Sequence, residues 1–552
     1  MYLFGTHHSI AQRLRLTARR QLGAGNFFWH ACDVADLDRP AIFRLDGTDV
    51  RELTLRELRD RVNTYANWYH ANGVGHGTRV GIYTEDGLLG LLHHIAVTSL
   101  GGVSVIANPK MAPDIAEGYF AAAEATMLAA DESRLAKMSE LENLETVDIT
   151  TVHRAEAGEG DPPPRPYRHA DDDLIMISHS SGTTGVPKPT TFTHRGFFVG
   201  KRERLWKFPS MKSDRLLTAL PQSHSAGISY VSLAMMLGLP TMMLDDASGS
   251  SVAAGMNAFL PTTVVGFPIS LADLDVADLS DDAKQSVHTW MGMGDASHQR
   301  HILPLVRIGR TADGSGTGST YLDGLGSSEM GMVLFRQAYR AGSESYDRAI
   351  GTPVPVVRKA AALDPQGNEL PDDEAGLLGV RTPSVTPGYV NNEELNEQSR
   401  RGGYFLTGDV VRHENGTWYH LDRTPDVIVT EDGPVYSLLA EELVLKETQA
   451  FDAGVVAVDD PKAEEFSRPI AVVLFKDGAL TADEALARCN TALEERGMAR
   501  LAAVVVAENR DELPVGVTGK VLKRVLRERH RTILSGEAGP GVAIASSSVE
   551  MT

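Results

Sequence analysis

The sequence predicts an α/β protein, with a large N-terminal multi-layer α/β domain and a small mobile C-terminal α+β domain. Short apolar runs such as "RVGIYTE", "GVSVIANP" and "TTVVGFP" have the pattern of buried strands. Between them, segments such as "TLRELRDRVNTYANWYHANG" repeat apolar residues at helical spacing and end at a glycine. With 552 residues and 42% hydrophobic composition, the chain is long enough to bury more than one core.

The pattern of the chain changes after residue 422. "AGVVAVDDP" and "RPIAVVLFKDG" predict strands, "TADEALARCNTALEERG" predicts a helix, and a basic helix follows. We therefore expect a large domain over residues 1–422 and a small lid domain over 423–535. The tail 536–552 is rich in Gly, Ala and Ser and is expected to be disordered.

Composition excludes several classes of function. The formal net charge of −20 argues against nucleic acid as a partner. The two cysteines, Cys32 and Cys489, stand far apart, so neither a disulfide framework nor a zinc site is expected, and the predicted compartment is the reducing cytoplasm. The longest apolar stretch is broken by Pro240 and is shorter than the roughly 20 residues that span a bilayer. No membrane span is predicted. The Arg-rich N-terminus predicts an amphipathic first helix.

The loop "HSSGTTGVPK" directly follows the apolar run "DLIMIS". Glycines allow close approach of the backbone to a ligand, and successive N–H groups with hydroxyls can surround phosphate oxygens. Its spacing differs from that of a Walker A loop, and a Gly/Thr-rich turn by itself is more often a surface loop. The candidate phosphate-binding residues are Ser180, Ser181, Gly182, Thr183, Thr184, Gly185 and Lys188.

Five further blocks follow this loop in a fixed order: "LPQSHSAGISY", "DGLGSSEMG", "LLGVRTPSVTPGYVNN", "GYFLTGDVVRHENGTWYHLDR" and "LPVGVTGKVLKRVLRER". Together with the loop, they resemble the adenylate-forming superfamily, which includes acyl-CoA synthetases, peptide-synthetase adenylation domains and firefly luciferase. The resemblance spans nearly all of residues 50–530. It implies an AMP-forming ligase that uses ATP and Mg²⁺, with CoA as a further cosubstrate in many members.

The resemblance also implies roles for individual residues. Glu329 matches the acidic residue that holds Mg²⁺, and Asp409 matches the carboxylate that accepts both ribose hydroxyls. Arg423 matches the arginine that reaches ribose and phosphate at the domain junction. Lys520 matches the catalytic lysine, which stabilises the charge that develops between the acid and the α-phosphate. The remaining nucleotide contacts implied are Thr184, Asp323, Leu325, Ser328 and Tyr419.

The implied acid pocket is lined by "HSAGISY", "MGMGDAS" and "DGLGSS". His224 stands at its mouth and is a catalytic candidate with Lys520, Thr184 and Glu329; a packed, hydrogen-bonded histidine is an equal alternative. Small side chains are expected to leave room for an aromatic or medium-chain acid. The pocket candidates are His224, Ser225, Gly227, Gly292, Gly294 and Gly324.

Two departures from the family pattern bear on the acceptor. Pro425 stands where the family has its hinge residue, and proline restricts rotation about φ. Glu431 and Asp432 stand in the loop that normally closes over pantetheine, where they would repel CoA phosphates; a solvated turn is the more common role of such residues.

Three functions remain open. A carboxylate–CoA ligase is favoured by base rate. A CoA-independent enzyme would pass its activated acid to an amine, including nitrite activation that diazotises or nitrosates an aryl amine. A nucleotide-binding sensor without chemistry is the third hypothesis, and the presence of Lys520 argues against it. The sequence does not indicate an oligomeric state.

Overall fold

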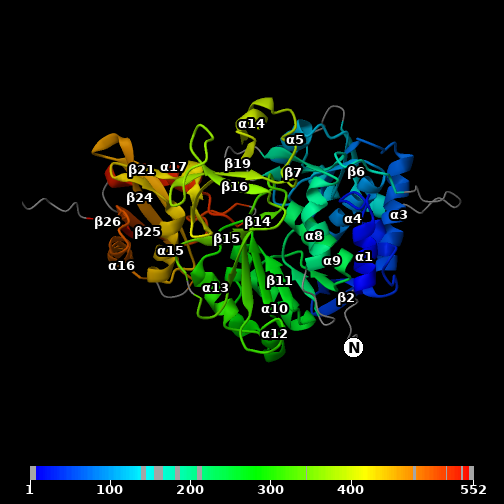
Figure 1. Ribbon diagram of the computed structural model, residues 1–552, viewed down its shortest axis with the longest axis horizontal. Helices are drawn as coiled ribbons and strands as arrows, with labels where there is room; N and C mark the ends of the chain where they lie inside the picture. The colour runs from blue at the N-terminus through cyan, green and yellow to red at the C-terminus, as the bar shows by residue number, and fades with distance from the viewer. Residues whose placement is uncertain are drawn as a thin grey trace, which may run out of the picture.

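The computed structural model describes residues 8–138, 144–154, 166–180, 187–207, 214–343, 345–476, 480–516, 519–535 and 539–545. Figure 1 shows a large lobe that runs from blue to yellow and a smaller lobe, orange to red, beside it. This arrangement confirms the predicted α/β class with a large N-terminal and a small C-terminal domain. Within the described ranges, every helix is too short or too polar to cross a bilayer.

A six-stranded sheet lies in the N-terminal part of the large lobe, in the order β6-β5-β3-β4-β7-β8. Its strands pair in parallel except for the last pair, which is antiparallel. The strands are β3 (Arg79–Tyr83), β4 (Val103–Ile106), β5 (Met127–Ala130), β6 (Glu145–Asp148), β7 (Leu174–Ser180) and β8 (Lys188–Thr193).

A second sheet has 14 strands, and its main path runs β16-β17-β19-β20-β15-β14-β13-β12-β11-β9-β10-β1-β2, with β18 paired to β19. Strands β1 and β9 to β13 pair in parallel, and the others pair antiparallel. The strands on the parallel side are β1 (Pro40–Asp46), β2 (Asp49–Thr54), β9 (Leu216–Thr218), β10 (Thr241–Met243), β11 (Thr263–Gly266), β12 (Thr289–Met293) and β13 (Thr320–Gly326). The antiparallel side has β14 (Val333–Tyr339), β15 (Ala349–Pro353), β16 (Lys359–Leu363), β17 (Ala375–Arg381), β18 (Arg400–Arg401), β19 (Tyr404–Glu414) and β20 (Thr417–Arg423).

Helices fill the space between the two sheets. The largest core cluster joins residues of α3, α4, α8 and α9 to strands of both sheets. Almost every residue of α9 is buried, as expected of a helix that is apolar on all sides. Other clusters cover the outer faces of both sheets, so the lobe is layered. The helices of this lobe are α1 (Ile10–Ala18), α2 (Phe27–Cys32), α3 (Leu55–Ala71), α4 (Gly87–Ser99), α5 (Pro113–Ala122), α6 (Glu132–Leu135), α7 (Ile149–Arg154), α8 (Val199–Lys207), α9 (Ser225–Leu237), α10 (Gly249–Phe259), α11 (Pro268–Ala272), α12 (Asp281–Ser286), α13 (Gln299–Val306) and α14 (Glu393–Gln398).

The small lobe has its own sheet and its own two core clusters. Its strands are β23 (Asp452–Asp460), β24 (Ala463–Leu474), β25 (Ala503–Ala507) and β26 (Val542–Ile544), and a hairpin of β21 (Ile428–Thr430) and β22 (Gly433–Val435) precedes them. Its helices are α15 (Ser437–Thr448), α16 (Ala482–Glu495) and α17 (Lys523–His530). The division predicted at residue 422 stays a prediction.

The tail prediction needs a correction. Part of the segment expected to be disordered forms β26, which pairs antiparallel with β25. The short run Val-Ala-Ile can cover the open edge of the sheet, and Ala543 is 2% exposed. Residues 536–538 and 546–552 lie outside the described residues.

Buried charges hold the two lobes together. Glu442 of α15 is 2% exposed, and its Oε2 lies 2.8 Å from His298 Nδ1 at the start of α13. Its Oε1 accepts a hydrogen bond from the backbone N–H of Gln299 at 2.7 Å. Burial alone would lower the pKa of His298, but the Glu442 carboxylate outweighs it and raises that pKa. The small lobe is therefore anchored beside the strand ends described next.

Candidate active site

The carboxyl ends of four parallel strands bring the candidate residues to one edge of the large sheet. β9 leads to His224, β11 leads to Ile269 on α11, β12 leads to Asp295, and β13 leads to Glu329. In open α/β sheets, ligands bind beyond the carboxyl ends of the strands. The small lobe adds Lys520 at this edge, where its charge acts on His224.

Asp409 forms a buried cluster of charge on the antiparallel side of the same sheet. It pairs with Arg423 across β19 and β20, with Arg423 Nε 3.1 Å from Asp409 Oδ1. His420 Nε2 lies 3.4 Å from the same oxygen. Burial opposes ionisation, yet Arg423 and then His420 lower the pKa of Asp409 to about 2. The carboxylate therefore stays ionised at neutral pH and is suited to accept hydrogen bonds from sugar hydroxyls.

Glu329 follows β13 and keeps part of its carboxylate available. Its Oε1 accepts a hydrogen bond from the Tyr389 hydroxyl at 3.2 Å, and its backbone carbonyl accepts one from Thr386 N at 2.8 Å. Among the described residues, Oε2 has no hydrogen-bond partner. No group of three or more His, Cys, Asp or Glu in the described chain could hold a metal ion by itself. Glu329 fits Mg²⁺ coordination in which nucleotide phosphates supply the other ligands.

Lys520 reaches the site on a tight turn. The backbone N–H of Gly516 donates to the carbonyl of Lys520 at 2.7 Å, and Gly519 has a φ of +83°. A Cβ at Gly519 would lie 2.1 Å from Ile269 Cγ2, so only glycine allows the turn to press against α11. Burial lowers the pKa of Lys520, and the charge of Asp295 acts against this.

His224 caps the N-terminus of α9. Its Nδ1 accepts a hydrogen bond from Ala226 N at 3.2 Å, which places the ring proton of a neutral imidazole on Nε2. Burial, with His179 and Lys520 nearby, lowers the pKa of His224 to about 3. The imidazole is therefore neutral at physiological pH and can donate one hydrogen bond to an anion without being a cation.

The glycines predicted to leave room in the pocket serve close packing instead. A Cβ at Gly292 would lie 1.9 Å from the Tyr321 hydroxyl, and one at Gly227 would lie 2.3 Å from the Pro221 carbonyl. Gly294 has a φ of +89° and lies against Phe267, and Gly324 lies under Val333. Neighbouring side chains occupy the space that small residues leave, so the composition of these blocks does not measure the pocket.

Asp323 lies in a separate buried network. Its Oδ1 accepts a hydrogen bond from Ser297 Oγ at 2.7 Å, and burial raises the pKa of Asp323. Leu325, two residues on, packs against the cluster that contains Leu334. Ser328 and Ser225 are buried nearby. The roles that the resemblance implies for these residues toward adenine and acid stay predictions.

The structure leaves part of the phosphate loop unplaced. Ser180 ends β7 and pairs with Lys188 at the start of β8, so the loop leaves and re-enters the sheet at this point. Ser181, Gly182, Thr183, Thr184 and Gly185 lie outside the described residues. Tyr419 neighbours His420 on β20, so its side chain points to the other face; Arg412 lies 5.4 Å from its ring. The structure does not bring Tyr419 to the Asp409 cluster.

Sequence reasoning did not single out four residues that the structure brings into the site. Asp295 acts electrostatically on Lys520 and Arg423. The Tyr389 hydroxyl donates to Glu329 and His420 lies beside Asp409, and both residues stand inside blocks that carry the family resemblance. His179 on β7 is 4% exposed, and its Nε2 has no partner among the described residues. Its only signal in the sequence is its position before the Ser/Thr loop.

The regions that depart from the family pattern are exposed. Pro425 lies in the 3₁₀ turn Thr424–Asp426, which follows β20 directly. Glu431 and Asp432 form the tip of the β21–β22 hairpin, closed by a 2.7 Å hydrogen bond from Thr430 Oγ1 to the Gly433 carbonyl. Neither carboxylate has an ion-pair partner in the described part of the chain. They form a solvated acidic turn.

Comparison with known proteins identifies the family. The family model described as AMP-binding enzyme matches residues 28–390. The chain is 34% identical to a 3-aminoavenalumate diazotase from a Streptomyces species, over 94% of this chain and 98% of that protein. It is 27% identical to the long-chain-fatty-acid–CoA ligase of Thermus thermophilus, over 90% of this chain and 94% of that protein.

Solved structures share the fold. An anthranilate CoA ligase, AuaEII, in complex with anthranoyl-AMP aligns with a TM-score of 0.77 at 19% identity, covering 93% of this chain and 98% of that one. The O-succinylbenzoate CoA synthetase of Bacillus subtilis, in complex with ATP and magnesium, aligns with a TM-score of 0.75 at 21% identity, covering 91% and 99%. The chain thus belongs to the AMP-binding enzyme family and is an adenylate-forming ligase that activates an acid with ATP.

Proposed function

We propose that the acid is nitrite and that the acceptor is an aryl amine, so that the enzyme is an ATP-dependent diazotase. The observation that carries this proposal is the 34% identity, over nearly the whole chain, to a diazotase, against 27% for a fatty-acid–CoA ligase. The sequence alone favours a carboxylate–CoA ligase by base rate. The identity to a diazotase reverses that order.

The acidic turn supports an acceptor other than CoA. Glu431 and Asp432 are exposed at the hairpin that, by family resemblance, would face pantetheine. Two carboxylates without a cationic partner in the described chain would repel the phosphates of CoA. An amine carries no such phosphates.

The reaction proceeds in two steps. A nitrite oxygen attacks the α-phosphorus of ATP, the bond to the β-phosphate oxygen breaks, and pyrophosphate leaves. The amine nitrogen then attacks the nitrosyl nitrogen of the mixed anhydride, AMP leaves with the bridging oxygen, and a proton is released. The N-nitroso product tautomerises to a diazohydroxide, its hydroxyl takes up a proton, and loss of water gives the diazonium ion. No oxidant or reductant is consumed.

The residues at the strand ends supply what the first step needs. Lys520 stabilises the negative charge on the α-phosphate oxygens during attack. Neutral His224 donates its Nε2 hydrogen to the small anion and holds it in place. Asp409 and Arg423 bind the ribose. A Mg²⁺ ion held by Glu329 and the phosphates would neutralise part of the negative charge of the phosphates. The contact of Gly519 with Ile269 closes the edge and excludes water, which would hydrolyse the anhydride.

Pyrophosphate release with a panel of acids tests this proposal. Nitrite, benzoates and fatty acids are each incubated with enzyme, ATP and Mg²⁺, and CoA or an aryl amine is then added to the active mixtures. We expect release with nitrite, and a diazonium product that couples to a naphthol when an aryl amine is present. Release that depends on a carboxylate, followed by thioester formation with CoA, would refute the proposal. Release with no acid at all would indicate a different reaction.

A further inference from the structure

Arg336 faces the helices between the two sheets. Arg336 lies on β14 opposite Gly324 of β13, and Val333 lies opposite Gly326. Gly324 and Gly326 are two residues apart, so they share one face of β13. A bulge between the two pairs places Val333 and Arg336 on that same face. Val333 packs against the core cluster that contains residues of α9, so this face of β14 points toward the helices between the two sheets. Arg336 thus points inward from a strand that ends beside the active site.

Arg204 approaches the same place from α8. A Cβ at Gly200, one turn before it, would lie 2.4 Å from Met332 Cε, so α8 presses directly on the start of β14. Residues four apart share a helix face, so Arg204 also points toward β14. The charge of Arg204 acts on Arg336, and Tyr230 of α9 lies near enough to act on it as well.

These two arginines lack counterions. Burial and then the positive charge of Arg204 lower the pKa of Arg336. The Nη2 of Arg204 is buried without a hydrogen-bond partner in the described structure, and no ion pair is formed by either arginine among the described residues. Lys201, one turn earlier, is buried and donates to the carbonyl of Phe197, and burial lowers its pKa well below the usual value. Both arginines are half-buried, and a partly desolvated positive face without an acid is costly unless a ligand supplies the anion.

Arg202 on the same helix shows how a structural arginine is satisfied here. Its guanidinium donates to the backbone carbonyls of Thr17, Arg19 and Leu22 at 2.8 to 3.3 Å. Arg204, two residues on, has no such acceptors in the described chain. A purely structural role would leave Arg204 and Arg336 as an uncompensated repulsive pair.

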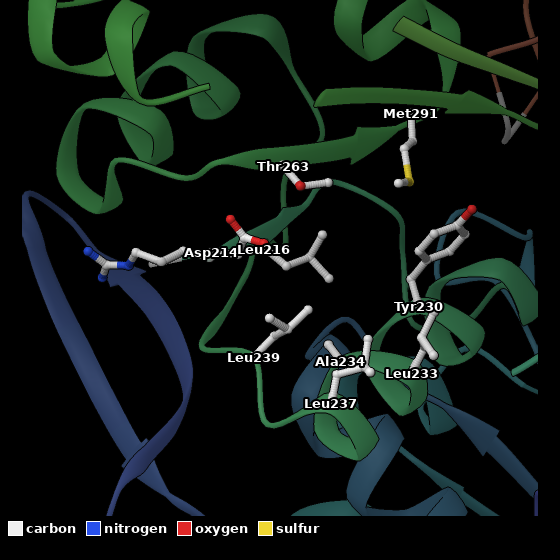
Figure 2. Close-up of a pocket in the computed structure, with 10 residues that line it drawn as sticks. Asp214, Leu216, Tyr230, Leu233, Ala234, Leu237, Leu239, Thr263 and Met291 are labelled. Atoms are coloured by element: carbon white, nitrogen blue, oxygen red, sulfur yellow. The ribbon is translucent and has the colours of Figure 1, made fainter. Parts of the chain in front are cut away.

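We call the place of the arginine pair the inner end of the site, because Arg336 stands opposite Gly324, which by family resemblance lines the acid pocket. Tyr230 stands six residues beyond His224 on α9, which corresponds to about 9 Å along the helix. Below it, Figure 2 shows Tyr230 and Met291 among the apolar side chains around a cavity of about 10 Å³, with the tyrosine hydroxyl directed away from Leu216 and Leu239. That cavity has room for about one water.

We propose that Arg204 and Arg336 form an anion-binding site for a carboxylate carried by the aromatic amine, which directs the amino group toward Lys520 and His224. This inference rests on the proposed function, because it assigns the pocket to the amine acceptor. The two guanidinium groups and the Tyr230 hydroxyl supply donors for a carboxylate. The substrate class is an aminoaryl carboxylic acid.

Binding of matched ligands tests the site directly. 3-Aminobenzoate and aniline, which share the ring and the amine, are titrated by calorimetry into the wild type and into the variants Arg336→Met and Arg204→Met. We expect 3-aminobenzoate to bind the wild type at least about 10-fold tighter than aniline, since only the carboxylate can accept charge-assisted hydrogen bonds from the arginines. In both variants this preference should fall to within about 3-fold. Arg336→Lys should restore part of it.

Arg195→Met is the matched control. Arg195 is 67% exposed, pairs with Asp171 and precedes α8, so this variant changes net charge equally without touching the pocket. It should keep the full preference for 3-aminobenzoate. Equal binding of both ligands to the wild type, or an unchanged preference in both folded arginine variants, would overturn the inference. The wild-type comparison decides the question even where a variant fails to fold.

Nitrite-dependent pyrophosphate release, measured without amine, separates the two proposals. It should be equal in the wild type and in Arg195→Met, and it reports on the proposed function alone. A wild type that releases no pyrophosphate with nitrite refutes the diazotase function, whereas the ligand titrations still decide whether the arginines bind a carboxylate.

Discussion

The two ends of the active site treat charge in opposite ways. At the nucleotide end, opposite charges lie near one another: Arg423 and His420 contact Asp409, and the charge of Asp295 acts on Lys520. At the inner end, Arg204 and Arg336 face each other without an acid in the described chain. Paired charges form a site that is ready before the ligand arrives. Unpaired buried charges carry a cost that the correct ligand removes.

This difference separates common chemistry from specificity. The nucleotide end binds a cosubstrate that all members of the family share, so a pre-organised arrangement of opposite charges suits it. In our proposal the inner end selects among acceptors, because half-buried cations disfavour a substrate that does not bring an anion. Four experiments break or sharpen this contrast.

The largest effect is expected for Lys520→Ala. It removes the cation that stabilises the α-phosphate during attack, so acid-dependent pyrophosphate release should fall by about 10²-fold or more. ATP affinity should stay within a few-fold, as measured by calorimetry. Lys462→Ala, at an exposed turn of the small lobe, is the control and should retain full activity. Pyrophosphate release near the wild-type rate in Lys520→Ala would refute the proposed role of Lys520.

Asp409→Asn tests the paired end through binding. Loss of the ionised acceptor should weaken ATP by about 1.5–3 kcal/mol, or roughly 10- to 100-fold in Kd. The apparent affinity for the amine should not change, because the two ends are independent. Asp372→Asn, which removes an exposed partner of His413, should leave Kd for ATP unaltered. ATP affinity that is equal in Asp409→Asn and the wild type would show that the carboxylate does not bind the nucleotide.

Arg336→Met tests the unpaired end through stability. Removing an uncompensated, half-buried charge should raise the free energy of unfolding by up to about 1 kcal/mol in the absence of ligand. Arg202→Met should do the reverse, because three backbone carbonyls lose their donor. Urea denaturation of both variants measures the contrast. Destabilisation of equal size in the two would mean that Arg336 is satisfied in the free protein.

The smallest effect concerns the pH dependence of Lys520. Burial lowers the pKa of Lys520, and its active ammonium form is present below that pKa and lost as the pH rises through it. The rate of adenylation should therefore fall on the alkaline side at a lower pH than for an ordinary lysine. Asp295→Asn removes the charge that raises this pKa, so the alkaline limb should move to still lower pH. If the alkaline limb of the pH–rate profile does not move in Asp295→Asn, the charge of Asp295 does not influence the pKa of Lys520.

Much of the nucleotide end was predictable from the sequence. Glu329, Asp409, Arg423 and Lys520 each stand in a short contiguous block, and the structure brings their charges near one another, since Asp409 and Glu329 act on Arg423 and Arg423 acts on Lys520. Their individual roles toward ATP stay predictions until the variants above are measured. The tail strand β26 was not predicted, because an edge strand of three residues depends on a sheet edge formed elsewhere in the chain.

The arginine pair at the inner end could not be predicted from the sequence. Arg204 and Arg336 stand outside the blocks that carry the resemblance, in segments that read as an ordinary polar helix and an ordinary strand. A charged residue becomes informative only when its burial and its lack of partners are known. Asp295 and His179 were missed for the same reason, since both acquire meaning from neighbours that are distant in the sequence.

The sequence by itself determined the α/β class, the two-domain organisation and the adenylate-forming chemistry, because periodicity and contiguous motifs are local properties of the chain. The tertiary structure decided which charges are satisfied. Pairing across strands, the pressure of α8 on β14 and the closure of Gly519 on Ile269 are contacts between distant segments. Electrostatic cost depends on those contacts, and it is this cost that points to the substrate's carboxylate.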